Sequence, residues 1–215
     1  MKHSRYSRYS AAVLAACCFF AAGCKVLSAP QSDDGGLKGG QNTSPSVSYQ
    51  ISNPNPKVGE SVVVTVTANG QPVPTNTGST VTSSDQGVLF GVAAAYRAVA
   101  VGKSTISISY SSYFQSQVVN VSPSADGMAA YVYLQGNVFS GLSFGPRAVS
   151  VKAGSSVEFK LPDTTHNITF DGTPGAPANV AVGTSSTPSM VFGTAGVFAY
   201  QCTLHGETGT ITVVP

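Results

Sequence analysis

Apolar and polar residues alternate in short runs along most of this chain. Between residues 47 and 123 the alternating runs are SVVVTVTA, STVTSS, STISISYSS and QSQVVNVS. Between residues 125 and 215 they are MAAYVYLQG, RAVSVKAG, SSVEFKLP, HNITFDG, PSMVFGTAG, VFAYQC and TGTITVV. A period of two over short runs that end in turn residues predicts β-strands, and no helical period stands out in either part. Short strands at this spacing predict an all-β fold of sandwich or barrel type.

The N-terminus follows a different pattern. Basic residues precede an apolar run over residues 11–22, which is too short to span a bilayer comfortably but suits the core of a signal peptide. The run ends in AAGC, which resembles the lipobox of bacterial lipoproteins. That resemblance implies removal of residues 1–23 and lipidation of Cys24. The alternative is an ordinary cleaved signal that leaves Cys24 as a free thiol.

The residues after this cysteine predict a spacer. Residues 24–46 contain few apolar residues and much Gly, Ser, Gln and Asp, so we expect a flexible tether. Lys25 stands where an Asp would indicate inner-membrane retention of a lipoprotein. The lipoprotein resemblance therefore implies an outer-membrane anchor, facing the periplasm or the cell surface, as the only membrane contact.

The composition provides few residues that could carry out catalysis or bind a metal or nucleic acid. Charged residues make up 9% of the chain and the net charge is +2, so we expect no nucleic-acid partner. Removal of the signal would leave Cys24 and Cys202 as the cysteines, and His166 and His205 as the histidines. If Cys24 carries lipid, Cys202 has no disulfide partner. A lone thiol in an exported protein is a liability unless something binds it.

Residues 47–123 resemble the bacterial Ig-like domains of surface proteins. The resemblance rests on KVGE before a strand, SSDQGV in the middle and AVAVGKSTISISY near the end. It implies an Ig-like β-sandwich. This part contains no His or Cys, and its acidic residues are Glu60 and Asp85. We therefore expect a spacer or a docking module here.

The candidate chemistry lies in residues 125–215. In HNITF, His166 shares one face of the expected strand with the apolar residues two and four positions later. In VFAYQC, Cys202 shares one face with two aromatic residues, and His205 follows in the turn. Two strands and one turn can thus bring one thiolate and two imidazoles together. Two His and one Cys in a trigonal arrangement are the ligand set of blue copper.

The same residues resemble a cupredoxin of the plastocyanin and amicyanin type. SFGPRAVSVKAGSSVEF, THNITFD and GVFAYQCTLHGETGTITV carry the resemblance across nearly the whole of residues 125–215. It implies a Greek-key β-sandwich that holds one type 1 copper ion through His166, Cys202 and His205. It also implies single-electron transfer with redox partner proteins of the bacterial envelope.

Two positions depart from this family pattern. The family's axial Met commonly stands three residues after the second His, where this chain has Thr208, and Leu161 stands near the place of an Asn that braces the ligand loop. Thr208 is the first candidate for the axial position and Glu207 the second. Because desolvating a carboxylate is costly, we expect Glu207 to be solvated and the axial bond to be weak or missing.

Other interpretations of these residues are open. Zinc could be held by the three donors with water or Glu207 as the fourth, or the sandwich could have lost its metal. We expect no enzyme, since His205 is too close to Cys202 in sequence to be a typical base and two histidines are too few for a multicopper enzyme. Copper carriage or buffering, and an adhesion or assembly lipoprotein with an incidental metal, are the alternatives to electron transfer.

Overall fold

The computed structural model describes residues 45–75, 78–137 and 141–215. The expected signal peptide, Cys24 and most of the expected tether lie outside these residues. Every regular element in the described part is a strand, which confirms the all-β fold class. No helix in that part is long and apolar enough to cross a membrane.

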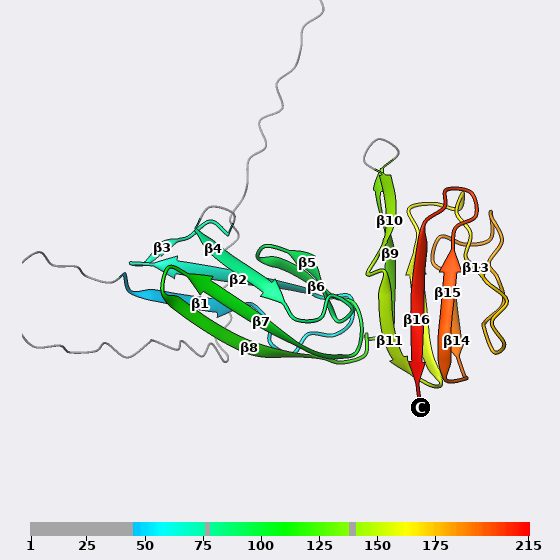
Figure 1. The fold of residues 1–215 in the computed structure, drawn as a ribbon, viewed down its shortest axis with the longest axis horizontal. Helices are drawn as coiled ribbons and strands as arrows, with labels where there is room; N and C mark the ends of the chain where they lie inside the picture. The colour runs from blue at the N-terminus through cyan, green and yellow to red at the C-terminus, as the bar shows by residue number, and fades with distance from the viewer. Residues whose placement is uncertain (1–44, 76–77, 138–140) are drawn as a thin grey trace, which may run out of the picture.

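The first part of the chain forms two antiparallel sheets around one core (Figure 1). One sheet has the order β1-β2-β6-β5 with β3 beside β2, and the other has the order β4-β7-β8. The strands are β1 (Val47–Ile51), β2 (Ser61–Ala68), β3 (Gln71–Pro72), β4 (Ser79–Ser83), β5 (Leu89–Val92), β6 (Ala95–Ala98), β7 (Gly102–Tyr110) and β8 (Tyr113–Val121).

The second part forms another pair of sheets around a separate core. One sheet has the order β10-β9-β12-β14 and the other β11-β16-β15-β13; β9 with β12 and β11 with β16 are the parallel pairs. The strands are β9 (Ala130–Asn137), β10 (Gly141–Gly145), β11 (Ala148–Lys152), β12 (Ser155–Lys160), β13 (Thr169–Phe170), β14 (Ser189–Phe192), β15 (Gly196–Gln201) and β16 (Thr208–Val214).

Strict alternation in the sequence produces the buried faces of these strands. In β2, Val62, Val64 and Val66 are 0%, 2% and 1% exposed, while the residues between them are exposed to solvent. Successive strand residues point to opposite faces, so one face of β2 enters the core. Burying a valine side chain contributes about 1.5–3 kcal/mol, which is why the apolar set fixes the register.

Aromatic rings pack under the end of β15. The ring of Tyr200 lies 5.0 Å from that of Phe144 and 5.0 Å from that of Phe159, in edge-to-face geometry. Such pairs add about 0.5–1.5 kcal/mol to the burial of the rings. The packing of these rings therefore restricts the movement of the residues that follow Tyr200.

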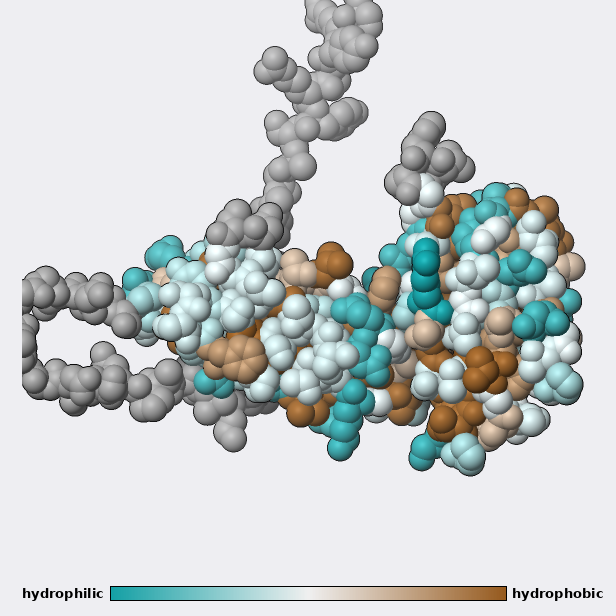
Figure 2. All heavy atoms as spheres, viewed as in Figure 1, coloured by the Kyte–Doolittle hydropathy of each residue, from teal (hydrophilic) through white to brown (hydrophobic). Residues whose placement is uncertain are grey.

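Apolar side chains are exposed at both ends of the second sandwich, including Leu204, which is 57% exposed in the loop between β15 and β16. Figure 2 shows brown atoms near the lower end of this sandwich, where Figure 1 marks the C-terminus. Val197, at the start of β15, and Val214, at the end of β16, are 60% and 42% exposed. The loop between β15 and β16 lies at the opposite end (Figure 1).

Backbone hydrogen bonds join the two sandwiches. The amide of Tyr131 donates to the carbonyl of Val99 at 2.7 Å, and the amide of Val101 donates to the carbonyl of Ala129 at 2.9 Å. Ala100 pairs with Ala130 in an antiparallel bridge and belongs to the core of the second sandwich. The connection is therefore a short piece of ladder and not a free linker.

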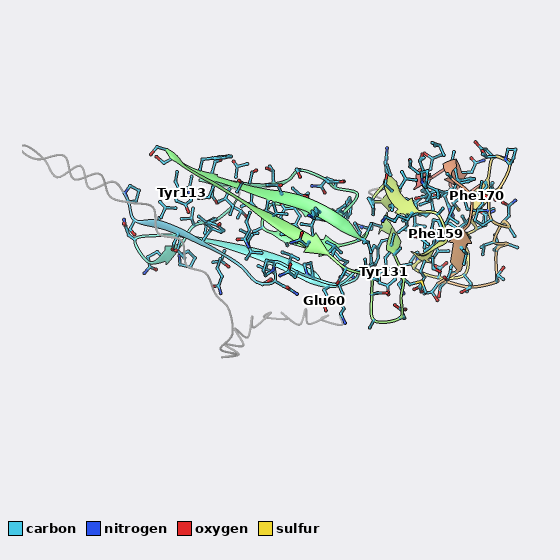
Figure 3. All side chains as sticks on the ribbon, turned by 90° about the horizontal axis from the view of Figure 1, so that it is seen from below. Glu60, Tyr113, Tyr131, Phe159 and Phe170 are labelled. Carbon is cyan, nitrogen blue, oxygen red and sulfur yellow. The ribbon has the colours of Figure 1, made fainter. Side chains whose placement is uncertain are left out.

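Side chains extend this junction on the outer face of β9. Tyr131 lies at the meeting point of the sandwiches, on the side where Glu60 marks the near end of the first (Figure 3). A Cβ atom added to Gly59 would lie 2.8 Å from the Tyr131 ring, so only glycine allows this approach. Arg97 stacks its guanidinium 5.0 Å from the ring centre of Tyr133 and donates to the Tyr133 hydroxyl at 3.3 Å.

Candidate metal centre

A tight loop between β15 and β16 carries most of the candidate ligands. Gln201 and Thr208 are the last paired residues of the two strands, and both are exposed. One position further, the amide of Cys202 donates to the carbonyl of Glu207 at 2.9 Å. Because side chains alternate along a strand, this next pair points to the inner side of the sheet. Cys202 and Glu207 are accordingly buried.

The structure brings the three expected ligands together. Cys202 Sγ lies 3.7 Å from His166 Nδ1 and 3.5 Å from His205 Nδ1, and the two Nδ1 atoms are 3.1 Å apart. Metal bonds of about 2.0–2.3 Å to nitrogen and sulfur hold neighbouring donors roughly 3–4 Å apart. These spacings therefore fit one mononuclear metal ion.

The three donors differ in their contact with solvent. Cys202 is 0% exposed and His166 is 4% exposed, whereas His205 lies in the exposed part of the loop. The Cys202 thiol is free and has no disulfide partner among the described residues. A metal held here would be shielded by protein on the thiolate side and would reach the surface through the His205 ring.

Glu207 joins this group, and Thr208 does not. A carboxylate oxygen of Glu207 lies within 4.8 Å of the other three donor atoms, and the residue is 8% exposed. The expectation that Glu207 is solvated is therefore wrong. Its Oε2 atom is buried and has no hydrogen-bond partner.

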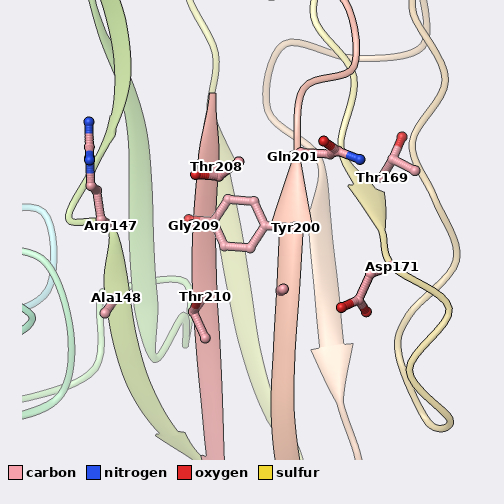
Figure 4. A pocket seen from close by; sticks show the side chains of 10 residues that line it. Arg147, Ala148, Thr169, Asp171, Tyr200, Gln201, Thr208, Gly209 and Thr210 are labelled. Atoms are coloured by element: carbon pink, nitrogen blue, oxygen red, sulfur yellow. The ribbon is translucent and has the colours of Figure 1, made fainter. Parts of the chain in front are cut away.

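Thr208 occupies the opposite face of the sheet. It is exposed and lines a shallow pocket of about 540 Å³ together with Thr169 and Gln201 (Figure 4). The Thr208 hydroxyl is thus placed away from the cluster of donors. The physical reason is the hairpin register, which directs residue 207 inward and residue 208 outward.

Asn167 braces the ligand loop, a role that sequence reasoning did not assign. The Asn167 side chain accepts from the amide of Thr203 at 2.9 Å and donates to the Thr203 hydroxyl at 2.9 Å. This pair of bonds ties the segment after His166 to the segment after Cys202. Leu161, which stands near the place of the family's bracing Asn, is 7% exposed and belongs to the apolar core. The signal for Asn167 was its position directly after the histidine.

Asp163 lies on the outer side of His166. Its Oδ1 atom is 3.9 Å from His166 Nε2, the ring nitrogen that faces away from Cys202. The hydroxyl and the amide of Thr165 donate to the same oxygen and hold the pKa of this carboxyl below its usual range, with the two nearby imidazoles adding to the effect. A carboxylate beside the outer nitrogen of a ligating histidine helps to fix the ring.

The donor set fits a type 1 copper site with a carboxylate beside it. A soft thiolate and two imidazoles suit copper, and a nearby cation offsets the cost of burying a carboxylate oxygen without a partner. Of the methionines in the described part, Met128 accepts a hydrogen bond from the Ser189 hydroxyl at 3.5 Å, and Met190 belongs to β14 and to the apolar core. His166, Cys202, His205 and Glu207 are therefore the residues that could hold the metal.

Comparison with known proteins points to the same class. No family model matches the chain. A plastocyanin from Prochlorothrix hollandica is 39% identical over 79 residues, which are 32% of this chain and 60% of that protein. The chain thus spans less than two thirds of this relative.

Solved structures of the same class also match the chain. Oxidised plastocyanin from Dryopteris crassirhizoma is 29% identical, with 40% of this chain and 100% of that chain covered and a TM-score of 0.33. A reduced amicyanin mutant is 25% identical, with 42% and 86% covered and a TM-score of 0.35. The plastocyanin match and the cluster of donors together support a cupredoxin domain in this chain, as the ligand-loop resemblance implied.

Proposed function

We propose that this protein is a copper-binding electron carrier in which His166, Cys202 and His205 hold one type 1 copper ion. The observation that carries the proposal is the separation of their donor atoms, 3.1–3.7 Å, in a described part of the chain that has no other free cysteine. We assign the site to a cupredoxin domain over residues 125–215, preceded by an Ig-like domain over residues 47–123.

Each residue of the site contributes through its place in the fold. Copper, when bound, supplies a one-electron change between Cu(II) and Cu(I). Cys202 and His166 are buried and keep water from the metal. Asn167 and the packed rings of Tyr200 and Phe144 hold the donors in place, so little movement accompanies a change in the charge of the copper. His205 offers an exposed edge to a partner protein.

The assignment to electron transfer, and not catalysis, follows from what the loop provides. A thiol enzyme needs a base that orients and deprotonates its cysteine, and a substrate must reach the sulfur. Cys202 is 0% exposed, which closes the sulfur to a substrate. We therefore propose transient redox partner proteins as the partners, and neither a substrate nor nucleic acid.

Replacement of the thiolate tests this function. Wild-type protein with one equivalent of Cu(II) is expected to show an intense visible thiolate-to-copper band. Cys202→Ser is expected to lose the band, because a serine oxygen cannot give that transition. The absorption spectrum and the copper content are measured together, with Thr208→Val as a control on the outer face. An unchanged spectrum in Cys202→Ser would contradict the proposal.

Zinc is the second candidate for the metal. The burial of Glu207 favours it, because two His, one Cys and one carboxylate complete a tetrahedral set. Protein produced with both metals present separates the candidates. Copper in the purified protein, with reversible one-electron reduction, supports the carrier, whereas zinc alone supports a storage or structural site.

We also propose that the protein is exported and anchored through lipid on Cys24. The support is the order of a basic start, an apolar run and AAGC in residues 1–24. Cys24→Ser is expected to release the protein from membranes or to block its processing, which cell fractionation and mass spectrometry of the N-terminus would measure. A mature N-terminus at another residue, without lipid, would rule out this anchor.

A further inference from the structure

The Glu207 side chain has a position that protein stability alone does not explain. It is 8% exposed, its Oε2 atom has no hydrogen-bond partner, and its carboxylate lies within 4.8 Å of a thiol and two imidazole nitrogens. Burial of a carboxylate without a partner is unfavourable, since the lost hydration is not replaced. The position becomes favourable when a cation stands among the four donors.

We propose that Glu207 is the fourth donor to the copper and that its carboxylate lowers the reduction potential of the site. The inference rests on the proposed function, in which His166, Cys202 and His205 hold the metal. Among the described His, Cys, Asp and Glu side chains, Glu207 is the one that joins the three donors. Thr208 faces the outer side of the sheet, the thioether of Met128 accepts a hydrogen bond from the Ser189 hydroxyl at 3.5 Å, and Met190 belongs to β14.

The charge of the site explains the direction of the effect. With one thiolate and one carboxylate around Cu(II), the centre is neutral, and uptake of one electron leaves a net charge of −1. Without the carboxylate, the same electron would take the centre from +1 to 0. A buried negative charge is disfavoured in a surrounding of low dielectric, so the carboxylate makes reduction less favourable. No atom is transferred; one electron arrives from a donor protein and leaves to an acceptor.

The chemistry of the ligand acts in the same direction. A carboxylate is a hard, anionic donor, and it prefers the more highly charged Cu(II) over the soft Cu(I). The partner that reduces this centre must therefore be a stronger reductant than one that serves the same centre without a carboxylate. Glu207 would in this way select the class of electron donor that the protein accepts.

Two substitutions of Glu207 test the proposal. Glu207→Gln keeps the shape and removes the charge, and Glu207→Ala removes the donor. Thr208→Val is the matched control, because it lies next in sequence but on the other face. In both Glu207 variants the ratio of Cu(II) to Cu(I) at a fixed applied potential is expected to fall at least tenfold. For a one-electron couple that corresponds to a rise of about 59 mV in the reduction potential.

Electron paramagnetic resonance of the Cu(II) forms gives an independent signal. We expect the spectra of Glu207→Gln and Glu207→Ala to differ from wild type, and the spectrum of Thr208→Val to superimpose on it. Glu207 variants with an unchanged potential and spectrum, in a wild type that shows the thiolate band, would overturn the inference and leave the proposed function standing. A wild type without that band would overturn both.

The metal-free protein supplies a readout that does not depend on loading. Glu207→Gln is expected to unfold at a higher urea concentration than wild type when no metal is present, because the variant buries no uncompensated charge. With one equivalent of Cu(II), the stabilisation that the metal gives is expected to be smaller in Glu207→Gln than in wild type. A metal-free Glu207→Gln that is less stable than wild type would overturn the proposal, since the carboxylate would then stabilise the fold without a metal.

Discussion

Tyr96 joins the two sheets of the first sandwich through a single hydroxyl. The residue belongs to β6 and is 3% exposed. Its Oη atom lies 2.9 Å from the carbonyl oxygen of Val81 in β4 and 3.0 Å from that of Ala93, so its one proton is shared between two acceptors. Burial raises the pKa of the Tyr96 hydroxyl. The fold therefore requires the protonated form of this side chain.

The contribution of Tyr96 to stability is expected to depend on pH. An unfolded tyrosine loses its proton near pH 10, whereas the folded one keeps it to higher pH, so the contribution is complete below about pH 10 and is lost above it. The difference in unfolding free energy between wild type and Tyr96→Phe should then shrink by up to about 1.4 kcal/mol per pH unit.

Urea denaturation of the two proteins at pH 8, 10 and 11 measures this difference. Between pH 7 and 9 the gap should stay constant, which serves as the internal control. A gap that is constant up to pH 11 would show that the hydroxyl titrates alike in both states.

At the scale of single residues, the sequence correctly predicted the positions of residues that depend on strand alternation. Cys202 and His166 were expected on inner faces and are buried, and His205 was expected in the turn. Glu207 was expected in solvent because burying a carboxylate is costly. The hairpin register after Gly206 instead directs it inward. The position of Glu207 depends on its backbone pairing with Cys202 across the hairpin. That pairing cannot be predicted from the residue types alone.

At the scale of elements, β16 is the strand on which the metal centre depends. It pairs with β11 on one side and β15 on the other, and its first residue follows Glu207 directly. Gly209 sits under the Tyr200 ring, where an added Cβ atom would lie 2.2 Å from the Tyr200 hydroxyl oxygen. Because Gly209 has no side chain, the Tyr200 ring can pack directly against β16.

Gly209→Ala is expected to destabilise the second sandwich by about 1–3 kcal/mol, because either the Tyr200 ring or β16 must move. Thr210→Ala, on the outer face of the same strand, should stay within about 0.5 kcal/mol of wild type. Thermal unfolding of the metal-free proteins measures both. Equal melting temperatures for the two variants would show that the ring moves without cost.

The pattern of the sequence predicted long strands better than short ones. SVVVTVTA and TGTITVV coincide with β2 and β16, whereas HNITFDG yields only the short strand Thr169–Phe170. The strands β1, β3, β5, β6 and β10 were not predicted. They are short or contain glycine, as in LFGV and GLSFG, so their pairing is set by neighbouring strands and not by their own alternation.

At the scale of the whole molecule, a short junction joins the two sandwiches. Backbone bonds at Val99 and Val101, the stack of Arg97 on Tyr133 and the contact of Gly59 with Tyr131 all lie at this boundary. Adjacent domains usually move relative to each other unless their interface is extensive. A ladder of backbone bonds across the boundary removes the free linker that such motion needs.

Two glycine substitutions test the junction. Gly59 and Gly70 have φ angles of 96° and 75°, so alanine is strained at both, but only at Gly59 would the new Cβ atom strike a side chain, the Tyr131 ring. Gly59→Ala is expected to cost about 1–3 kcal/mol more than Gly70→Ala and to speed hydrogen exchange at the amides of Tyr131 and Val101. Unchanged exchange at those two amides in Gly59→Ala would speak against a tight junction.

A fixed junction would have a consequence for the kinetics of the proposed electron transfer. Tunnelling rates fall steeply with distance, and β1 begins at the end of the first sandwich that lies far from the second (Figure 1). If the junction holds the sandwiches fixed, a partner bound to the first one would meet the His205 edge at one separation and one angle. Electron exchange within such a complex would proceed at a single rate, and lengthening the segment before β1 would change how often partners meet but not how fast the electron crosses.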